Sequence, residues 1–210
     1  MMRFDRRVFL TGLLGLGACS GTPPEVAILP EFRGFLSIDP VRYSIEQGAD
    51  MLNHRGRLTG QPWEVARLVQ ALEFLAVELR NGSRSNVMLP MAQIAVPAAR
   101  PEWRQAFGIA GDARAQEVID SLSEMRSAFT ARSPAAAAAA LRAPLFTPGG
   151  QETLNRFGNP PALPRTTRAM LDARQELASQ SFERRSGQSF IVPLARVENA
   201  PSGGRAVVMG

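Results

Sequence analysis

The sequence predicts a mainly α-helical fold, a single irregular bundle of four to five main helices. Apolar residues recur at three- and four-residue spacing in several long segments, which is the pattern of helices with one buried face. Residues that favour helix starts and stops separate these segments. The chain has 210 residues, 45% of them hydrophobic, and its mean hydropathy is −0.09. These values are typical of a chain that folds around a core, as one domain or two small ones.

Two helices are expected in the first part of the domain. Asp39 and Pro40 suit the N-cap and the first position of a helix that ends near Gly56. One stripe of it holds Val41, Ile45, Gly48 and Leu52. A second helix is predicted from Pro62 to residue 79, before the stop signal Asn81-Gly82. Apolar residues lie on two of its faces, so we expect it at the centre of the fold.

The middle of the chain mixes clear and interrupted patterns. Prolines 90, 97 and 101 interrupt residues 86–108, which predicts two short helical pieces, at 91–95 and 102–107, rather than one long helix. Residues 112–131 give the clearest helical pattern in the chain. Its apolar positions are Ala115, Val118, Ile119, Leu122, Met125 and Phe129.

The last third begins with a short helix of alanines, which Ser133 and Pro134 cap. Residues 144–165 are rich in proline and glycine and are predicted to be loops. A last helix is expected over 165–184, burying Met170, Ala173, Leu177 and Ser181. For the C-terminal extension, residues 186–210, two alternatives remain: a small β-hairpin, built from 190–192 and 206–208, or a disordered tail.

Residues 1–18 have the three-part layout of a secretory signal peptide, with a basic start, an apolar stretch and a zone of small residues. Arg6, Arg7, Phe9 and Leu10 resemble the twin-arginine export signal, in which two arginines, any residue and Phe-Leu follow one another. The flanking Asp5 and Thr11 depart from that pattern, which usually has Ser or Thr before the arginines and often Lys after them. The resemblance implies export of a folded protein.

The segment Leu16-Gly17-Ala18-Cys19 resembles the lipobox of bacterial lipoproteins. This resemblance implies that Cys19 becomes the N-terminus and carries a thioether-linked diacylglycerol, usually with a third, amide-linked acyl chain. Two or more acyl chains anchor a protein stably to a bilayer. Ser20 stands where an Asp would favour the inner membrane, so the implied location is the outer membrane, facing the periplasm. Residues 19–34 contain three prolines and predict an extended tether of about 50 Å, followed by the helical domain at 35–185.

Composition excludes several classes of site. The 24 basic residues are all arginine, so no lysine is available for a Schiff base or a phosphate loop. Three of these arginines and one of the 19 acids lie in residues 1–18, which leaves a small, dispersed positive charge and argues against nucleic-acid binding. One cysteine and one histidine cannot form the usual zinc sites. We expect no metal and no cofactor.

The candidate catalytic residues are few. Glu46, Asp50 and His54 follow one another at four-residue spacing, so Asp50 could orient His54 as a base. They lie opposite the apolar stripe of their helix, and the pattern favours a solvated pair. Glu73 is the most unusual acid because it borders the apolar arc of the central helix. It is expected at a rim position, paired with Arg80 or with an arginine of a neighbouring helix.

Three functional hypotheses follow. The favoured one is an envelope lipoprotein, anchored to the membrane through lipid on Cys19, whose domain binds or scaffolds an envelope protein or cell-wall component without catalysis. The second is a carboxylate-dependent envelope hydrolase or accessory enzyme. The third is a helical domain that holds a small ligand beside Trp63 and Phe74, which a closed apolar cavity there would support.

Overall fold

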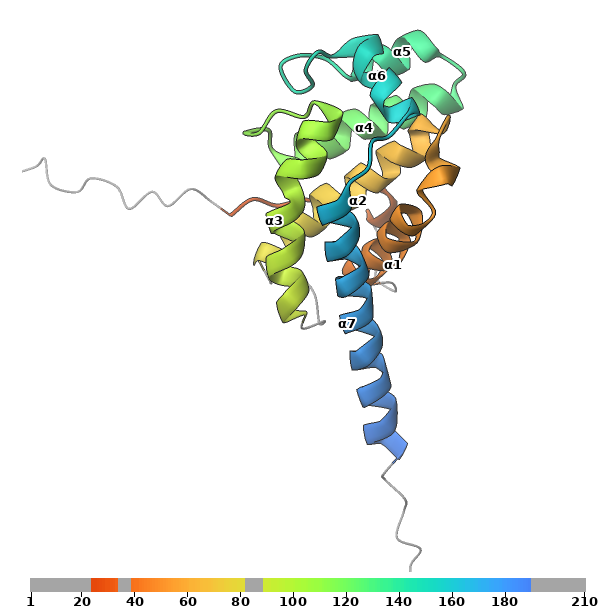
Figure 1. Ribbon diagram of the computed structural model, residues 1–210. Coiled ribbons are helices and arrows are strands. Elements are labelled where there is room, and N and C mark those ends of the chain that lie inside the picture. Colours follow the sequence, from red (N-terminus) through yellow and green to blue (C-terminus); the bar gives the residue numbers. More distant parts are fainter. Residues whose placement is uncertain (1–23, 34–38, 82–88, 190–210) are drawn as a thin grey trace, which may run out of the picture.

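A computed structural model describes residues 24–33, 39–81 and 89–189 of the chain (Figure 1). Within these ranges it contains seven α-helices and no β-strand, which confirms the predicted mainly α fold. The elements in chain order are η1 (Pro30–Phe32), α1 (Pro40–Asn53), η2 (Arg55–Leu58), α2 (Pro62–Asn81), α3 (Pro90–Phe107), α4 (Ala115–Thr130), α5 (Pro134–Ala140), α6 (Gly150–Gly158) and α7 (Pro164–Ser189). The signal peptide, Cys19 and residues 190–210 lie outside the described residues.

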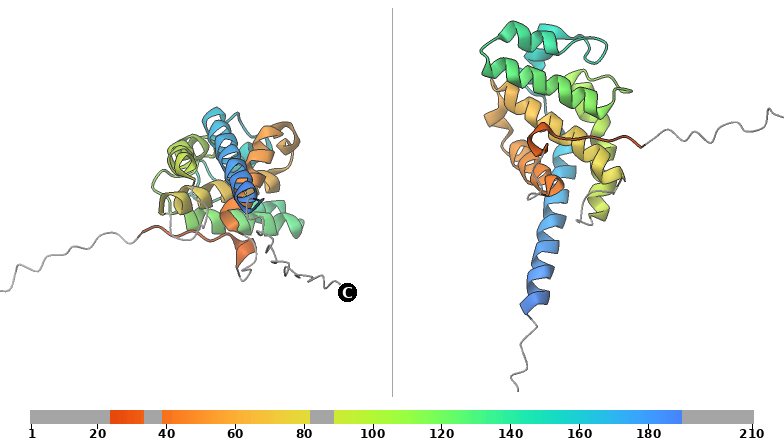
Figure 2. Two further views of the ribbon diagram at one scale, coloured as in Figure 1. Left: turned by 90° about the horizontal axis from the view of Figure 1, so that it is seen from below. Right: turned by 180° about the vertical axis from the view of Figure 1, so that it is seen from behind.

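Helix α2 occupies the centre of the bundle, as its two apolar faces predict. All of its residues from 68 to 79 are buried, and it packs against α1, α3, α4 and α6 (Figure 1). The view from below shows α7 between α1 and α3, where it packs against both helices (Figure 2). The central helix is therefore enclosed by neighbours, and a polar side chain on it must find its partners inside the protein.

Helix α1 begins where the sequence predicts. The Asp39 carboxylate accepts hydrogen bonds from the backbone N–H groups of Val41 and Arg42, at 2.9 and 3.3 Å, and so caps the helix. The predicted stripe faces the core, and Gly48 within it lets α7 approach closely. A Cβ at Gly48 would lie 2.7 Å from Cε of Met170.

Helix α3 differs from its prediction, because it runs without interruption from Pro90 to Phe107 with Pro97 and Pro101 inside it. Each internal proline lacks the N–H that would bond to the carbonyl four residues earlier. Tertiary contacts compensate for this local cost, since α3 packs along both α2 and α7. The Glu176 carboxylate of α7 also accepts the N–H groups of Met91 and Ala92, at 3.2 and 3.1 Å.

Helices α4, α5 and α6 form the end of the molecule at the top of Figure 1. Helix α4 begins at Ala115 rather than at residue 112, and its predicted apolar face is buried except for the half-buried Phe129. Helix α6 lies in the segment that was predicted to be loop. The turn after α3 needs glycine: Gly108 has φ +68°, and a Cβ there would collide with the carbonyl of Thr147.

The predicted free tether is wrong for residues 24–33, which lie against the helices as a segment that we call the strap (Figure 2, right). Ala27 and Leu29 are buried, whereas Val26 and Ile28 between them are exposed. Ile28 N–H donates to the side chain of Gln116 on α4, at 2.8 Å. Prolines suggested an unattached chain, but the alternating apolar residues and polar contacts hold it on the domain.

Helix α7 extends further than predicted, to Ser189, and its C-terminal half projects from the bundle in Figure 1. The helix therefore continues past the expected domain boundary at residue 185. Met170, Ala173 and Leu177 are buried as predicted, while Ser181 is half-buried. Among the described helices, none has the length and apolar character needed to cross a membrane.

Candidate functional site

The most unusual polar group of the described core is the Glu73 carboxylate on α2, which is fully buried. Its Oε1 accepts hydrogen bonds from the indole N–H of Trp103, at 2.8 Å, and from Nε of Arg104, at 2.9 Å. Its Oε2 accepts from a terminal nitrogen of Arg104 and one of Arg100, both at 2.7 Å. The three donors lie at positions i, i+3 and i+4 of α3, so they share the face that meets α2.

Arg100 connects this buried carboxylate to the strap. Its guanidinium donates to both oxygens of Glu25, at 3.2 and 3.3 Å, while it also binds Glu73. Glu25 in turn accepts the backbone N–H of Ala115, at 2.6 Å, at the start of α4. A carboxylate at this position also interacts favourably with the positive end of the helix dipole.

The surroundings of Glu25 and Arg100 favour the charged form of both side chains. Burial opposes ionisation of Glu25, but hydrogen bonds from Arg100 and from Ala115 N–H outweigh burial, and the pKa of Glu25 is lowered. Burial likewise opposes the charge of Arg100, and the carboxylates of Glu25 and Glu73 outweigh it, so the pKa of Arg100 is raised. Arg104 completes the cluster by donating to the carbonyls of Ala110 and Gly111, each at 3.0 Å.

We call Glu25, Glu73, Arg100, Trp103 and Arg104 the charge cluster. Two carboxylates face two guanidiniums, and both oxygens of Glu73 are occupied by donors of the protein itself. Such an arrangement holds helices together rather than offering an acid or base to a substrate. The expected arginine partner from a neighbouring helix is present, but the rim position and the pairing with Arg80 are wrong.

Asp50 and His54 lie together on the surface. Nδ1 of His54 is 3.1 Å from a carboxylate oxygen of Asp50, and the two side chains are 42% and 61% exposed. Glu46 is exposed one turn earlier. Neither Asp50 nor His54 lines any of the five best-defined pockets of the described residues. The pair therefore has the geometry of a solvated helix end, as the pattern favoured.

The neighbourhood of Trp63 contains an open groove of about 670 Å³ rather than a closed cavity. Trp63 is 39% exposed and its ring lies 5.8 Å from that of Phe129, centre to centre. Phe74 is buried in the core and does not line the groove. A ligand in this groove could therefore contact Trp63 but not Phe74.

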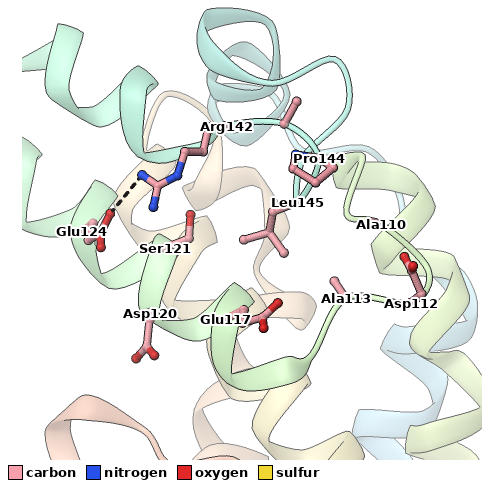
Figure 3. Close-up of a pocket in the computed structure, with 11 residues that line it drawn as sticks. Ala110, Asp112, Ala113, Glu117, Asp120, Ser121, Glu124, Arg142, Pro144 and Leu145 are labelled. Atoms are coloured by element: carbon pink, nitrogen blue, oxygen red, sulfur yellow. Dashed lines mark ion pairs between the residues drawn. The ribbon is translucent and has the colours of Figure 1, made fainter.

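An acidic groove of about 500 Å³ lies between α4 and the loop after α5, and none of its residues is among the candidates predicted from the sequence (Figure 3). Glu117, Asp120 and Glu124 of α4 line it, and Arg142 pairs with Glu124 across it, at 3.8 Å. Arg33 of the strap pairs with Asp120, at 3.1 Å. The sequence does carry a signal for this groove, because acids spaced three and four residues apart lie on one face of a helix.

No described part of the chain groups three or more histidine, cysteine or acidic residues in a way that could hold a metal ion. Comparison with protein-family models, with curated proteins and with solved structures finds no match. The geometry of this chain is therefore the basis for its proposed function.

Proposed function

We propose that the protein is a lipid-anchored envelope lipoprotein whose helical domain acts as a binding or scaffolding module at the periplasmic face of a membrane, the outer membrane in the first instance. The sequence of residues 1–21 supports the anchor, because an export-type segment leads directly to Cys19 in a lipobox-like context. The partner would be an envelope protein or a cell-wall component.

The observation that carries the scaffolding part is the attachment of the strap. Glu25 fastens the strap to α3 and α4 six positions after Cys19. Four residues, 20–23, separate Cys19 from the first described residue, Pro24, and the distance from Cys19 to Pro24 is at most about 17 Å when this segment is extended. A free tether to residue 34 would reach about 50 Å. Attachment of the strap would therefore keep the domain close to the anchor. A scaffolding module needs such a defined position, because it has to present its partner at a fixed distance from the membrane.

The ligand-binding alternative has one observation in its favour, the half-exposed Trp63 beside Phe129 in the open groove. A small molecule stacked on that indole would add a non-covalent mass to the protein in native mass spectrometry. A Trp63→Ala variant should lose that mass if the groove holds the ligand. Persistence of the mass in the variant would place the ligand elsewhere.

The anchor is tested by fractionation of cells that express the full chain. Cys19→Ser should release the protein from the membrane fraction, while Ser20→Ala should leave it there. Replacing Arg6 and Arg7 by lysine should block export if the twin-arginine route is used; unimpaired export would assign the general secretory route.

The scaffolding part needs a second experiment, with a photocrosslinking amino acid at exposed positions around the bundle, for example Glu117 and Gln151. The proposal expects one envelope partner to be crosslinked from one face, and expects that crosslink to disappear in the Cys19→Ser background. A crosslink that is independent of Cys19 would contradict a role that depends on membrane attachment.

A further inference from the structure

The outer face of α3 exposes apolar side chains in a row. Met91 is 65% exposed and Ile94 is 70% exposed. The apolar Ala98 and Pro101 continue the row, the polar but uncharged Gln105 ends it, and all three are exposed as well. These positions follow one another at three- and four-residue steps, so they form one stripe along four turns of the helix. We call it the α3 stripe.

The stripe carries no charge, because every charged side chain of α3 is directed to a partner elsewhere. Arg100 and Arg104 turn inward to Glu73. Glu102 turns to the start of α7, where its oxygens accept the N–H groups of Arg165 and Thr166, at 3.1 and 2.7 Å. The other sides of α3 pack on α2 and α7. An exposed helix face without charge over its whole length is a feature of interaction surfaces.

Arginines flank the stripe on both sides. Arg80, at the end of α2, shares a pocket with Pro101 and Gln105 of the stripe. On the other side, Arg165 and Arg168 of α7 share a pocket with Ala98. Arg168 pairs with Asp172, whereas Arg80 and Arg165 form no salt bridge with any other described residue. An apolar row between cations matches a bilayer surface with anionic headgroups.

The position of the strap brings this face toward the anchor. Glu25 binds Arg100 in the middle of α3, and the strap begins at the edge of the molecule that α3 forms, in both Figure 1 and the left view of Figure 2. The chain from there to Cys19 reaches at most about 17 Å. A lipid on Cys19 thus holds the bilayer beside α3.

We infer that the α3 stripe rests on the anionic phospholipid surface into which Cys19 is anchored. Met91 and Ile94 enter the boundary between headgroups and acyl chains, and Arg80 and Arg165 contact lipid phosphates. This inference rests on the proposed lipid anchor and adds an orientation of the domain, with the outer face of α3 turned to the bilayer.

The test uses the full chain, isolated from membranes and reconstituted in vesicles of phosphatidylethanolamine and phosphatidylglycerol. An intact mass first shows whether Cys19 is acylated. Acylation blocks the single natural thiol, so a polarity-sensitive fluorophore can be attached at Ile94→Cys or, as a matched control, at the exposed Gln151→Cys on α6. Brominated lipids then report which label touches the bilayer.

The inference expects several-fold stronger quenching at position 94 than at position 151, and a reduction when Arg80 and Arg165 are both changed to serine. Equal quenching at the two positions in acylated protein would overturn the orientation while leaving the anchor intact. A label at position 94 that is blue-shifted but not quenched would show that the stripe contacts protein instead of lipid. That result would also overturn the inference. An unacylated mass would refute the proposed function itself, and the inference with it.

Discussion

Glu25 and Glu73 accept hydrogen bonds from one guanidinium, that of Arg100, although one lies in the strap and the other in the central helix. This relationship joins the segment after the proposed anchor to the core of the domain. Arg100 of α3 therefore contacts both the strap and α2 through one guanidinium, and several consequences can be measured.

Glu73→Gln should destabilise the protein strongly. The change removes one negative charge from a buried cluster, so Arg104 loses its carboxylate partner while Arg100 keeps Glu25. Leaving a buried guanidinium without its partner costs about 3–5 kcal/mol in the free energy of unfolding. Urea unfolding of the purified chain measures this cost. The control is Asp172→Asn, which breaks an exposed pair with Arg168 and should cost less than about 1 kcal/mol. Equal midpoints for the two variants would refute a structural role of the cluster.

Glu25→Gln should loosen the strap while the bundle stays folded. The variant loses charge-assisted hydrogen bonds to Arg100 and to Ala115 N–H, worth about 1.5–3 kcal/mol. Hydrogen exchange at the Ile28 amide, which bonds to Gln116, should then speed up roughly ten- to hundredfold. Glu31→Gln, an exposed change in the same segment, should leave that rate unaltered. Unchanged exchange in Glu25→Gln would show that other contacts hold the strap.

Stability should fall in acid through Glu25 and Glu102, whose pKa values lie below the ordinary 4.5. For Glu102, burial opposes this lowering, and hydrogen bonds from Thr166 and from Arg165 N–H outweigh burial. At a pH between the folded and unfolded pKa values, the unfolded chain binds more protons, so stability rises with pH there. The contribution is complete above 4.5 and is lost as the pH falls through the lowered values.

Urea midpoints measured between about pH 6 and pH 3 check this prediction. The wild-type midpoint should fall more steeply than that of a Glu25→Gln, Glu102→Gln double variant. Parallel curves would show that neither carboxylate is responsible for the acid sensitivity.

The helices that the sequence predicted well are those whose local signals agree with their environment. Asp39 caps α1, and the apolar faces of α2 and α4 are buried. In these helices the spacing of apolar residues, the residues at the helix ends and the packing in the fold all indicate the same structure. Helix α3 was mispredicted because Pro97 and Pro101 disfavour a helix locally, and no local pattern reports its packing against α2 and α7.

Only part of the charge cluster could be predicted from the sequence. Glu73 could be singled out because it is an acid in a helix with apolar residues on two faces. Its partners could not, since Arg100 and Arg104 come from a segment that the prolines obscured. Glu25 was missed for a different reason: prolines indicated a tether, although Ala27 and Leu29 alternate with exposed residues as a docked extended chain does.

Gly108→Ala should destabilise the turn between α3 and α4. Gly108 has a left-handed conformation, and an added Cβ would meet the carbonyl of Thr147, a backbone atom that can shift only if the chain around it shifts too. A cost of about 1–3 kcal/mol is expected in thermal or urea unfolding. Gly111→Ala is the matched control, because its Cβ would meet nothing within 4 Å and its conformation is unstrained. An equally stable Gly108→Ala variant would contradict the close approach of Thr147.

The intact mass of the protein extracted from its own membranes shows whether the chain carries lipid on Cys19. We expect a chain of residues 19–210 that carries acyl groups at Cys19, five residues from the strap that Glu25 fastens to the domain. A chain that still begins at Met1 or Met2 and carries no lipid would contradict the anchor, and with it the proposed function.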